Sequence, residues 1–239
     1  MRTLKGKTAL VTGASSGIGE AIAGTLAAEG VNLVLVARSQ DKLKQIAHAL
    51  TRSYAVQCTV VPADLRTPNC GANVHAQVKA MGIAVDILVN NAGYGTYGPF
   101  DSIAPENEQA EIAVNIAAVV DFAHAFLPEM LKRGAGTILN VASTASFQPV
   151  PYMAVYAARK AFVLSVSEAL WAGYRGRGIY VVALCPSAVD TGFISQLGNE
   201  SVRKTAAFST TLQPEQVAAH AMKAIHGKVL RTSRVSRIG

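Results

Sequence analysis

The chain has 239 residues, half of them apolar and 15% charged, which is enough material for one large α/β domain over residues 1–239. Its 22 lysines and arginines exceed its 15 aspartates and glutamates, so the formal net charge of +7 keeps an anionic ligand or nucleic acid open as a partner. No export signal precedes the first apolar stretch, no apolar run approaches the length of a membrane span, and the three cysteines suit reduced thiols. We therefore expect a cytoplasmic protein that does not associate with a membrane.

Hydrophobic periodicity predicts strands that alternate with helices along the whole chain. Short apolar runs predict buried strands at 8–12, 32–37, 57–63, 86–90, 136–142 and 179–185. Helical periodicity lies between them, at 17–29, 39–52, 68–81, 106–132 and 156–176. Because strand and helix alternate, we expect right-handed crossovers and a doubly wound, Rossmann-like parallel sheet of six or seven strands with helices on both faces.

A glycine-rich turn, T-G-A-S-S-G-I-G, follows the first predicted strand and opens a helix. Gly13, Gly17 and Gly19 let the backbone approach a pyrophosphate closely and present N–H groups at the positive end of that helix. The spacing G-x-x-x-G-x-G differs from the common G-x-G-x-x-G, and a glycine-rich turn without a ligand is the alternative. We expect a dinucleotide to bind here through Gly13, Ser15, Ser16, Gly17, Ile18 and Gly19.

The end of the second strand indicates which dinucleotide is preferred. The sequence there is V-L-V-A-R-S, with Arg38 where an acidic residue would accept hydrogen bonds from a ribose without a 2′-phosphate. We therefore expect NADP(H) to be preferred over NAD(H), and Ser15 and Ser39 can add hydrogen bonds to the phosphate. The alternatives are an exposed loop cation at Arg38 and a simple helix cap at Ser39.

Tyr156 and Lys160 are four residues apart, so they share one face of a predicted helix. A nearby ammonium stabilises a phenolate, which makes a tyrosine usable as an acid or base near neutral pH. Ser143 comes at the end of the fifth predicted strand, 136–142, at the sheet edge where ligands bind in open α/β folds. The Y-x-x-x-K spacing alone also occurs in surface pairs, so the assignment of this site depends on the other motifs in the sequence.

Taken together, the motifs of this sequence resemble those of the short-chain dehydrogenase/reductase family. The shared motifs are T-G-A-S-S-G-I-G (12–19), A-D-L (63–65), N-N-A-G (90–93), the single Asn115, Ser143 and Y-A-A-R-K (156–160). They occur in the family's order over nearly the whole chain. The resemblance implies the strand order 3-2-1-4-5-6-7 and an oxidoreductase that moves hydride between NADP(H) and a carbonyl or secondary alcohol.

The resemblance also implies roles for individual residues. Tyr156 would be the general acid or base, Lys160 would assist it and bind the nicotinamide ribose, Ser143 would polarise the substrate carbonyl, and Asn115 would hold a relay water. Asn90 would stabilise the central sheet, and Asp64 would contact the adenine edge. The remaining cofactor contacts implied are Leu65, Asn91, Ala92, Gly93, Pro186, Val189 and Thr191.

Two features depart from the family pattern. Ser187 follows Pro186 where the family usually has glycine, and a serine lacks glycine's freedom at positive φ. The last dozen residues carry Lys228, Arg231, Arg234 and Arg237, and a seventh strand is hard to discern among them. The edge of the sheet beyond the sixth strand is therefore open at this stage.

Substrate choice is expected to depend on the segment 191–213 together with 94–100. Phe193, Ile194, Leu197 and Phe208 can form an apolar lid, while Arg203 and Lys204 either meet an anionic group or are solvated. These residues do not distinguish a sugar, a steroid, an acyl chain or a xenobiotic.

The remaining expectations concern assembly and alternative functions. The predicted helices 106–132 and 156–176 are apolar on more than one face, and in the family such helices form a dimer interface, so we expect a homodimer or homotetramer. The five histidines are dispersed, and we expect no catalytic metal. The alternatives are a non-catalytic NADP(H) sensor or scaffold on the same fold and, on net charge alone, a nucleic-acid binder.

Overall fold

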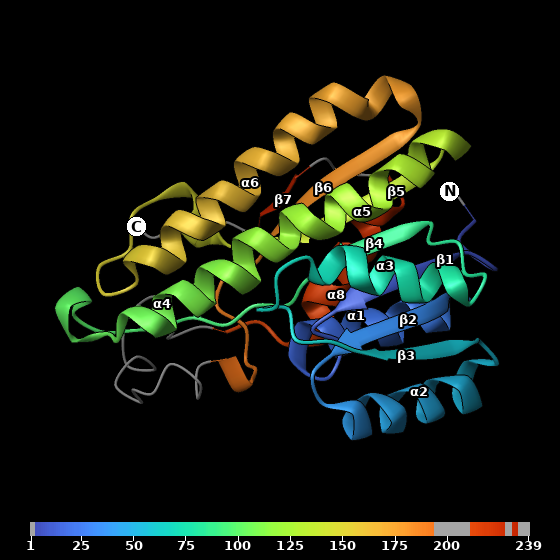
Figure 1. Ribbon diagram of the computed structural model, residues 1–239, viewed down its shortest axis with the longest axis horizontal. Coiled ribbons are helices and arrows are strands. Elements are labelled where there is room, and N and C mark those ends of the chain that lie inside the picture. Colours follow the sequence, from blue (N-terminus) through green and yellow to red (C-terminus); the bar gives the residue numbers. More distant parts are fainter. Residues whose placement is uncertain (1–2, 194–210, 228–230, 234–239) are drawn as a thin grey trace.

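The computed structural model describes residues 3–193, 211–227 and 231–233, the last without side chains. Its centre is a parallel β-sheet in the order β3-β2-β1-β4-β5-β6-β7 (Figure 1). The first six strands follow the expected order, and their bounds agree with the predicted apolar runs to within one residue. They are β1 Thr8–Thr12, β2 Asn32–Ala37, β3 Cys58–Pro62, β4 Ile87–Asn90, β5 Gly136–Val141 and β6 Ile179–Cys185. A three-residue strand, β7 (Arg231–Ser233), pairs in parallel with the end of β6.

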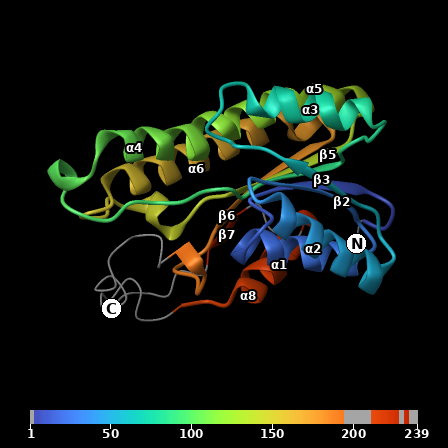
Figure 2. The same cartoon turned by 60° about the horizontal axis from the view of Figure 1, so that its bottom comes forward.

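Helices cover both faces of the sheet, as expected for a doubly wound fold. Figure 2 shows α1, α2 and α8 on one face and α3, α4, α5 and α6 on the other. The bounds are α1 Gly17–Ala28, α2 Gln40–Tyr54, α3 Cys70–Ala80, α4 Pro105–Ile112, α5 Ala118–Arg133, α6 Ala154–Tyr174 and α8 Pro214–Ile225. Alternate residues of each strand face opposite layers, so Ala9 and Val11 pack in one core cluster and Leu10 in the other. The family of Rossmann-like folds predicted from the pattern is therefore confirmed.

The predicted helix 106–132 is interrupted in the structure. A π-helical turn, Ala113–Ala117, separates α4 from α5, because one extra residue is accommodated before the α-helical pattern resumes. Over Pro105–Arg133 the combined helix is long and apolar enough to cross a membrane, with half of the tested window buried against the rest of the protein. A core helix passes the same test of length and composition, so this feature carries little weight as a membrane signal.

The strand order reverses between β1 and β4, because β1 pairs with β2 on one side and with β4 on the other. The crossovers from these two strands leave toward opposite faces, which opens a crevice beyond their carboxyl ends. The glycine turn follows β1, Arg38 follows β2, N-N-A-G spans the end of β4, and Ser143 follows β5. The fold therefore brings the predicted site residues to one edge of the sheet.

Candidate active site

The glycine turn after β1 has the conformation that its sequence requires. Gly13 and Gly17 have φ angles of 66° and 56°, a region that strongly favours glycine. Gly19 lies so close to the carbonyl of Gly13 and the amide of Asn91 that a Cβ could not be accommodated. Helix α1 then begins at Gly17, and its N-cap Ser16 makes no side-chain capping bond. The first-turn N–H groups of α1 are thus not capped by that side chain, which suits a bound pyrophosphate.

A hydrogen-bond network fixes the glycine turn against the end of β4. The hydroxyl of Thr12 accepts from the backbone N–H groups of Asn91 and Ala92 at 3.0 and 3.1 Å. The side-chain amide of Asn91 donates to the carbonyls of Thr12 at 2.9 Å and Gly13 at 3.4 Å. Asn91, expected as a cofactor contact, therefore has a structural task in shaping the turn.

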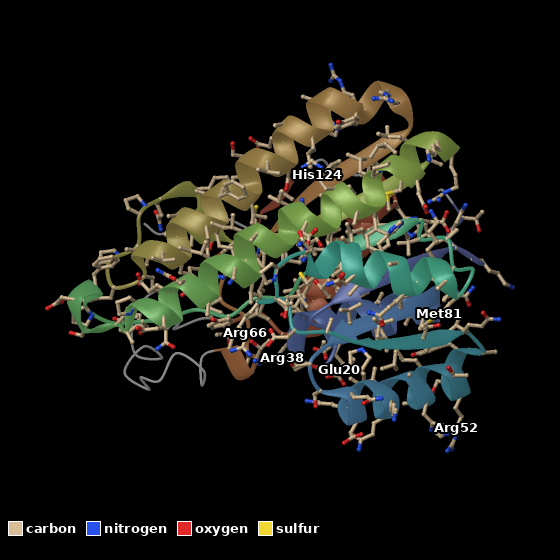
Figure 3. The ribbon with its side chains drawn as sticks, in the orientation of Figure 1. Glu20, Arg38, Arg52, Arg66, Met81 and His124 are labelled. Atoms are coloured by element: carbon tan, nitrogen blue, oxygen red, sulfur yellow. The ribbon has the colours of Figure 1, made fainter. Side chains whose placement is uncertain are left out.

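Two arginines lie near the candidate adenosine end of the site. Arg38 is exposed directly after β2, and Figure 3 shows it on the same side of the molecule as Arg66. Arg66 donates to Asp64 from Nε at 3.0 Å and from Nη2 at 2.5 Å. Those bonds, aided by the charges of Arg66 and Arg38, lower the pKa of Asp64 to about 2. Arg66 follows A-D-L directly, but no sequence motif pointed to it.

Ser143 and Lys160 are joined through Ser146. Ser143 caps the short helix Thr144–Phe147, and its Oγ accepts from the N–H of Ala145 at 3.2 Å. The hydroxyl of Ser146 accepts from the N–H of Ser143 at 3.3 Å and donates to the carbonyl of Lys160 at 2.8 Å. A hydroxyl that accepts as Ser143 does can still donate its own hydrogen. The strand end and α6 are therefore locked in a fixed relation.

Lys160 is buried beneath this corner of the sheet. Its Nζ donates to the carbonyl of Val141 at 2.7 Å, which leaves two ammonium hydrogens for other acceptors. Burial, and next the positive charge of Arg159, lower the pKa of Lys160 to about 7. Lys160 and Tyr156 lie one turn apart on α6, as predicted.

Tyr156 is half-buried and lies against apolar and charged neighbours. Its ring centre is 5.5 Å from that of Phe193, and the guanidinium carbon of Arg159 lies 4.4 Å from the Tyr156 ring centre. Met153 is buried beside Tyr156 with Tyr97 and Val150 around it. The side of the site next to Tyr156 is therefore largely apolar.

Asn115 lies within the π-helical turn and is buried. Its amide donates to the backbone carbonyl of Glu111 at 2.7 Å and to that of Tyr94 at 3.4 Å. Its Oδ1 is buried without a hydrogen-bond partner among the described residues, and it lies directly against Gly93. An unpaired buried acceptor at this position fits the relay water that the resemblance implies.

The segment after β6 closes the site over the glycine turn. Val189 and Leu212 form a parallel bridge. A Cβ added to Gly17 would lie 3.0 Å from the methyl group of Thr191, so the two segments are in close contact. Among the described residues, the only ones other than glycine with positive φ are Ala55, Asn69 and Tyr152, so Ser187 does not need glycine's freedom. The concern raised by Ser187 in place of glycine is thereby removed.

Several residues that the sequence assigns to the substrate segment or to the basic C-terminal group lie outside the described part of the chain. These are Ile194, Leu197, Arg203, Lys204 and Phe208 of the expected substrate segment, and Lys228, Arg234 and Arg237 of the basic C-terminal group.

Two buried polar clusters were not predicted. The Asn90 amide donates to Asn140 Oδ1 at 2.8 Å, and the Asn140 amide donates to Ser167 Oγ at 2.9 Å, which ties β4, β5 and α6 together. The other cluster joins Glu111 to Arg159 in an ion pair. The central stabilising role expected for Asn90 thus has a structural basis, whereas its partners come from distant parts of the chain.

Comparison with known proteins agrees with this geometry. The family model for short chain dehydrogenase matches residues 7–202. The chain is 34% identical over 233 residues to the ketoacyl reductase HetN of Nostoc sp., covering 95% of this chain and 78% of that protein. It is 36% identical over 203 residues to 17-beta-hydroxysteroid dehydrogenase type 3 of Rattus norvegicus, covering 84% of this chain and 66% of that protein. It spans less than two thirds of the length of several other animal relatives.

Solved structures agree as well. A short-chain dehydrogenase from Sphingobium yanoikuyae in complex with NADPH superimposes with a TM-score of 0.89 at 32% identity, covering 97% of this chain and 89% of that chain. The chain belongs to the short-chain dehydrogenase/reductase family. It is an oxidoreductase of the kind that interconverts alcohol and carbonyl groups.

Proposed function

We propose that this protein is an NADPH-dependent reductase of ketones with an apolar body, and that Tyr156 is its general acid and base. The observation that carries the proposal is the junction of β5 and α6, where Ser143 follows the strand and Tyr156 and Lys160 lie one turn apart in the helix. Lys160 shares a helix face with Tyr156. The hydroxyl of Ser146 donates to the backbone carbonyl of Lys160 and accepts from the backbone N–H of Ser143, which joins α6 to the end of β5. A non-catalytic sensor on this fold would not need that arrangement.

Residues at three strand ends would hold the cofactor. The uncapped first turn of α1 suits the pyrophosphate, and Gly13, Gly17 and Gly19 allow the close approach. Arg38 suits a 2′-phosphate, since a guanidinium binds phosphate oxygens in pairs, and the S. yanoikuyae relative was solved with NADPH. Ser15, Ile18, Asp64, Leu65, Ala92, Gly93, Pro186, Val189 and Thr191 complete the proposed lining.

The bound nicotinamide supplies the hydride, and the protein manages the proton. The hydroxyl of Ser143 would polarise the substrate carbonyl by donating its hydrogen to the oxygen. Tyr156 would then give its phenolic proton to the alkoxide as hydride arrives, leaving a phenolate. Lys160 would stabilise that phenolate, and a water at Asn115 would return the proton from solvent. Oxidation of an alcohol uses the same residues in reverse.

The walls near Tyr156 favour an apolar substrate. Val150, Tyr97, Phe193 and Tyr156 itself pack around the buried Met153, and Phe193 also lies against the Tyr156 ring, so one side of the phenol faces carbon surface. A sugar would leave its hydroxyl groups unpaired against such a wall, and each unpaired group costs binding free energy of about 1 to 3 kcal/mol. The steroid dehydrogenase named among the relatives is consistent with this substrate class.

We also propose a cytoplasmic location and self-association into a homodimer or homotetramer, with no role for nucleic acid or a membrane. Residues 1–239 would act as one domain. These proposals follow from the composition, the fold and the apolar faces of the long helices.

The substrate class can be tested by following NADPH absorbance with an aryl alkyl ketone, a steroid ketone and a ketose sugar in parallel. We expect kcat/KM for the apolar ketones to exceed that for the ketose by at least about a hundredfold, because two or more sugar hydroxyls would be left unpaired. A preference for the ketose would contradict the apolar substrate class. An absence of turnover with every carbonyl would contradict the reductase function itself.

A further inference from the structure

The middle of the motif Y-A-A-R-K carries a second cation that the reaction scheme above does not use. Arg159 precedes Lys160 on α6, and its side chain has no exposed surface. Arginine is almost never fully buried unless it is paired, and the partner here is Glu111 at the end of α4. The Arg159 Nε and Glu111 Oε1 atoms are 2.7 Å apart, and the Glu111 side chain is equally buried.

This ion pair is not an optimal structural bridge. The Arg159 N–H is not aimed along the line to the carboxylate oxygen, so the contact is close but forms no aligned hydrogen bond. Nη1 and Nη2 of Arg159 are also buried and have no hydrogen-bond partner among the described residues. A buried pair with unsatisfied donors contributes little stability compared with apolar packing. Its presence therefore points to a use other than holding the fold together.

The guanidinium is held against one ring. Its carbon lies 4.4 Å from the centre of the Tyr156 ring, within the range of a cation–π contact. The Glu111 carboxylate, which holds Arg159, is itself fixed by a 2.9 Å hydrogen bond from the hydroxyl of Thr96. A Cβ on Gly95 would lie 2.9 Å from the Tyr156 ring and 3.3 Å from Arg159 Nη2, so this loop packs tightly against both side chains.

The charges around Tyr156 make this second cation useful. Burial, and next the charge of Arg159, lower the pKa of Lys160, so its ammonium is held less firmly than an exposed lysine's would be. Burial lowers the pKa of Arg159, whereas the charges of Glu111, Tyr156 and Tyr94 oppose that shift. Burial also raises the pKa of Glu111 and of Tyr94, the other titratable groups that face the pair.

We propose that Arg159 is a positioning residue for the reaction: held by Glu111, its guanidinium fixes the ring of Tyr156 and stabilises the phenolate that forms when the proton leaves. The inference rests on the proposed function, because it assigns Arg159 a role through the general acid. Arg159 acts on the reacting oxygen only through Tyr156, and the role proposed for Lys160 is unchanged.

The test uses three variants of the full chain. Arg159→Met with Glu111→Gln removes both charges together and leaves no lone buried ion. Arg159→Lys keeps the positive charge. Glu111→Gln alone removes the opposing negative charge. Each is assayed for NADPH affinity by fluorescence and for the pH profile of ketone reduction.

We expect the uncharged double variant to bind NADPH within about twofold of the wild type and to lose about tenfold in kcat with little change in KM, because a desolvated cation–π contact is lost. The alkaline limb of its pH profile should move to higher pH. Arg159→Lys should recover most of the rate, and Glu111→Gln should move the same limb to lower pH. If the ion pair were only structural, the double variant and Glu111→Gln would not move the alkaline limb of the pH profile in opposite directions.

A second readout needs no turnover. The ultraviolet difference spectrum between each protein and its Tyr156→Phe counterpart follows ionisation of that one phenol with pH. Identical ionisation curves for the wild type and the double variant would overturn the inference, and so would a lysine variant as impaired as the double variant. If the wild type reduces no ketone but its curve still shifts in the double variant, the proposed function fails while the coupling of Arg159 to Tyr156 stands.

Discussion

Lys160 holds an amine in the protein interior, and this affects folding as well as chemistry. Its pKa of about 7 in the folded chain lies below the ordinary value near 10.5. Between these two pH values the unfolded chain binds more protons than the folded chain, so this group makes the free energy of unfolding rise with pH across that window. Below the window, folding must bury a charged ammonium at a cost.

Replacing Lys160 with methionine should therefore stabilise the protein most at the low end of that window. We expect the advantage of Lys160→Met over the wild type to shrink by about 3 kcal/mol as pH rises from 7 to 10. Urea unfolding followed by circular dichroism, without cofactor, measures it. The control is Lys132→Met, which changes an exposed lysine on α5 and should give a difference independent of pH. An advantage that stays constant or grows with pH would show that Lys160 is charged when buried.

Arg38 is the residue on which cofactor choice is proposed to depend. Arg38→Asp should weaken NADPH binding by at least about tenfold, since a carboxylate repels a 2′-phosphate that a guanidinium binds, and should improve NADH binding. Fluorescence titration with both cofactors measures the two affinities. Arg52→Asp, on the far part of α2 in Figure 3, is the matched control and should leave both affinities unchanged. Unaltered NADPH affinity in Arg38→Asp would remove Arg38 from the phosphate site.

At this scale the sequence predicted residues whose chemistry is visible in short motifs and missed those defined by distant partners. Tyr156, Lys160 and Ser143 could be found because spacing and position at a strand end point to them. Arg159 lies inside the same motif, but its importance depends on Glu111, 48 residues earlier, and on guanidinium nitrogens that find no hydrogen-bond partner in the described part of the chain. A local sequence pattern does not predict a buried ion pair between residues so far apart in the chain.

The packing of α3 against α5 shows how one element depends on a single glycine. A Cβ on Gly71, in the first turn of α3, would lie 2.6 Å from the backbone nitrogen of Phe122, and the Gly71 N–H donates to Asp121 at 2.7 Å. The two helix backbones therefore meet at a distance that only glycine allows.

Gly71→Ala should destabilise the protein by about 1 to 3 kcal/mol, because the added methyl group must push the two helices apart. Gly24→Ala is the matched control, since Gly24 lies inside α1 with no atom near its Cβ position. That change should stabilise by about 0.5 to 1 kcal/mol through helix propensity. Chemical unfolding of both variants measures the contrast. Equal effects at the two positions would mean that α3 and α5 can separate at little cost.

Element boundaries were predicted closely because apolar runs and glycine turns mark them. The exception is the single helix expected at 106–132, which the structure divides at Ala113–Ala117. A π-helical turn inserts one residue without changing the apolar character of the helix, so periodicity over such a length does not reveal it. Asn115, which breaks the apolar run there, was the one local sign of a functional position.

For the whole molecule, self-association is proposed on the apolar faces of the long helices, and α6 presents a row of exposed small residues that could take part in it. Ala158, Ala161, Ser165, Ala169 and Ala172 recur at helical spacing and are exposed in the single chain. Ser165→Arg should convert the assembly to a monomer at micromolar concentration, because a charged side chain would be buried between subunits. Sedimentation velocity measures this. Ser53→Arg, on exposed α2, is the control, and a wild type that is already monomeric would contradict the proposal.

The alternation of strands and helices was enough to predict a doubly wound sheet, but it does not by itself give the order of the strands. That order came from the family resemblance, and the first six strands follow it. The single-domain organisation over residues 1–239 stays a prediction. The edge beyond β6 could not be predicted because three residues of strand, Arg231–Ser233, are too few to produce a readable pattern.

The central claim is that Tyr156 provides the proton for NADPH-dependent ketone reduction, and the most direct test compares the wild type with Tyr156→Phe. The variant removes one hydroxyl and keeps the ring that packs against Arg159 and Phe193. We predict unchanged NADPH affinity by fluorescence and a loss of at least about a thousandfold in kcat for an apolar ketone, because the general acid is gone. Turnover by Tyr156→Phe within a few fold of the wild type would contradict the account.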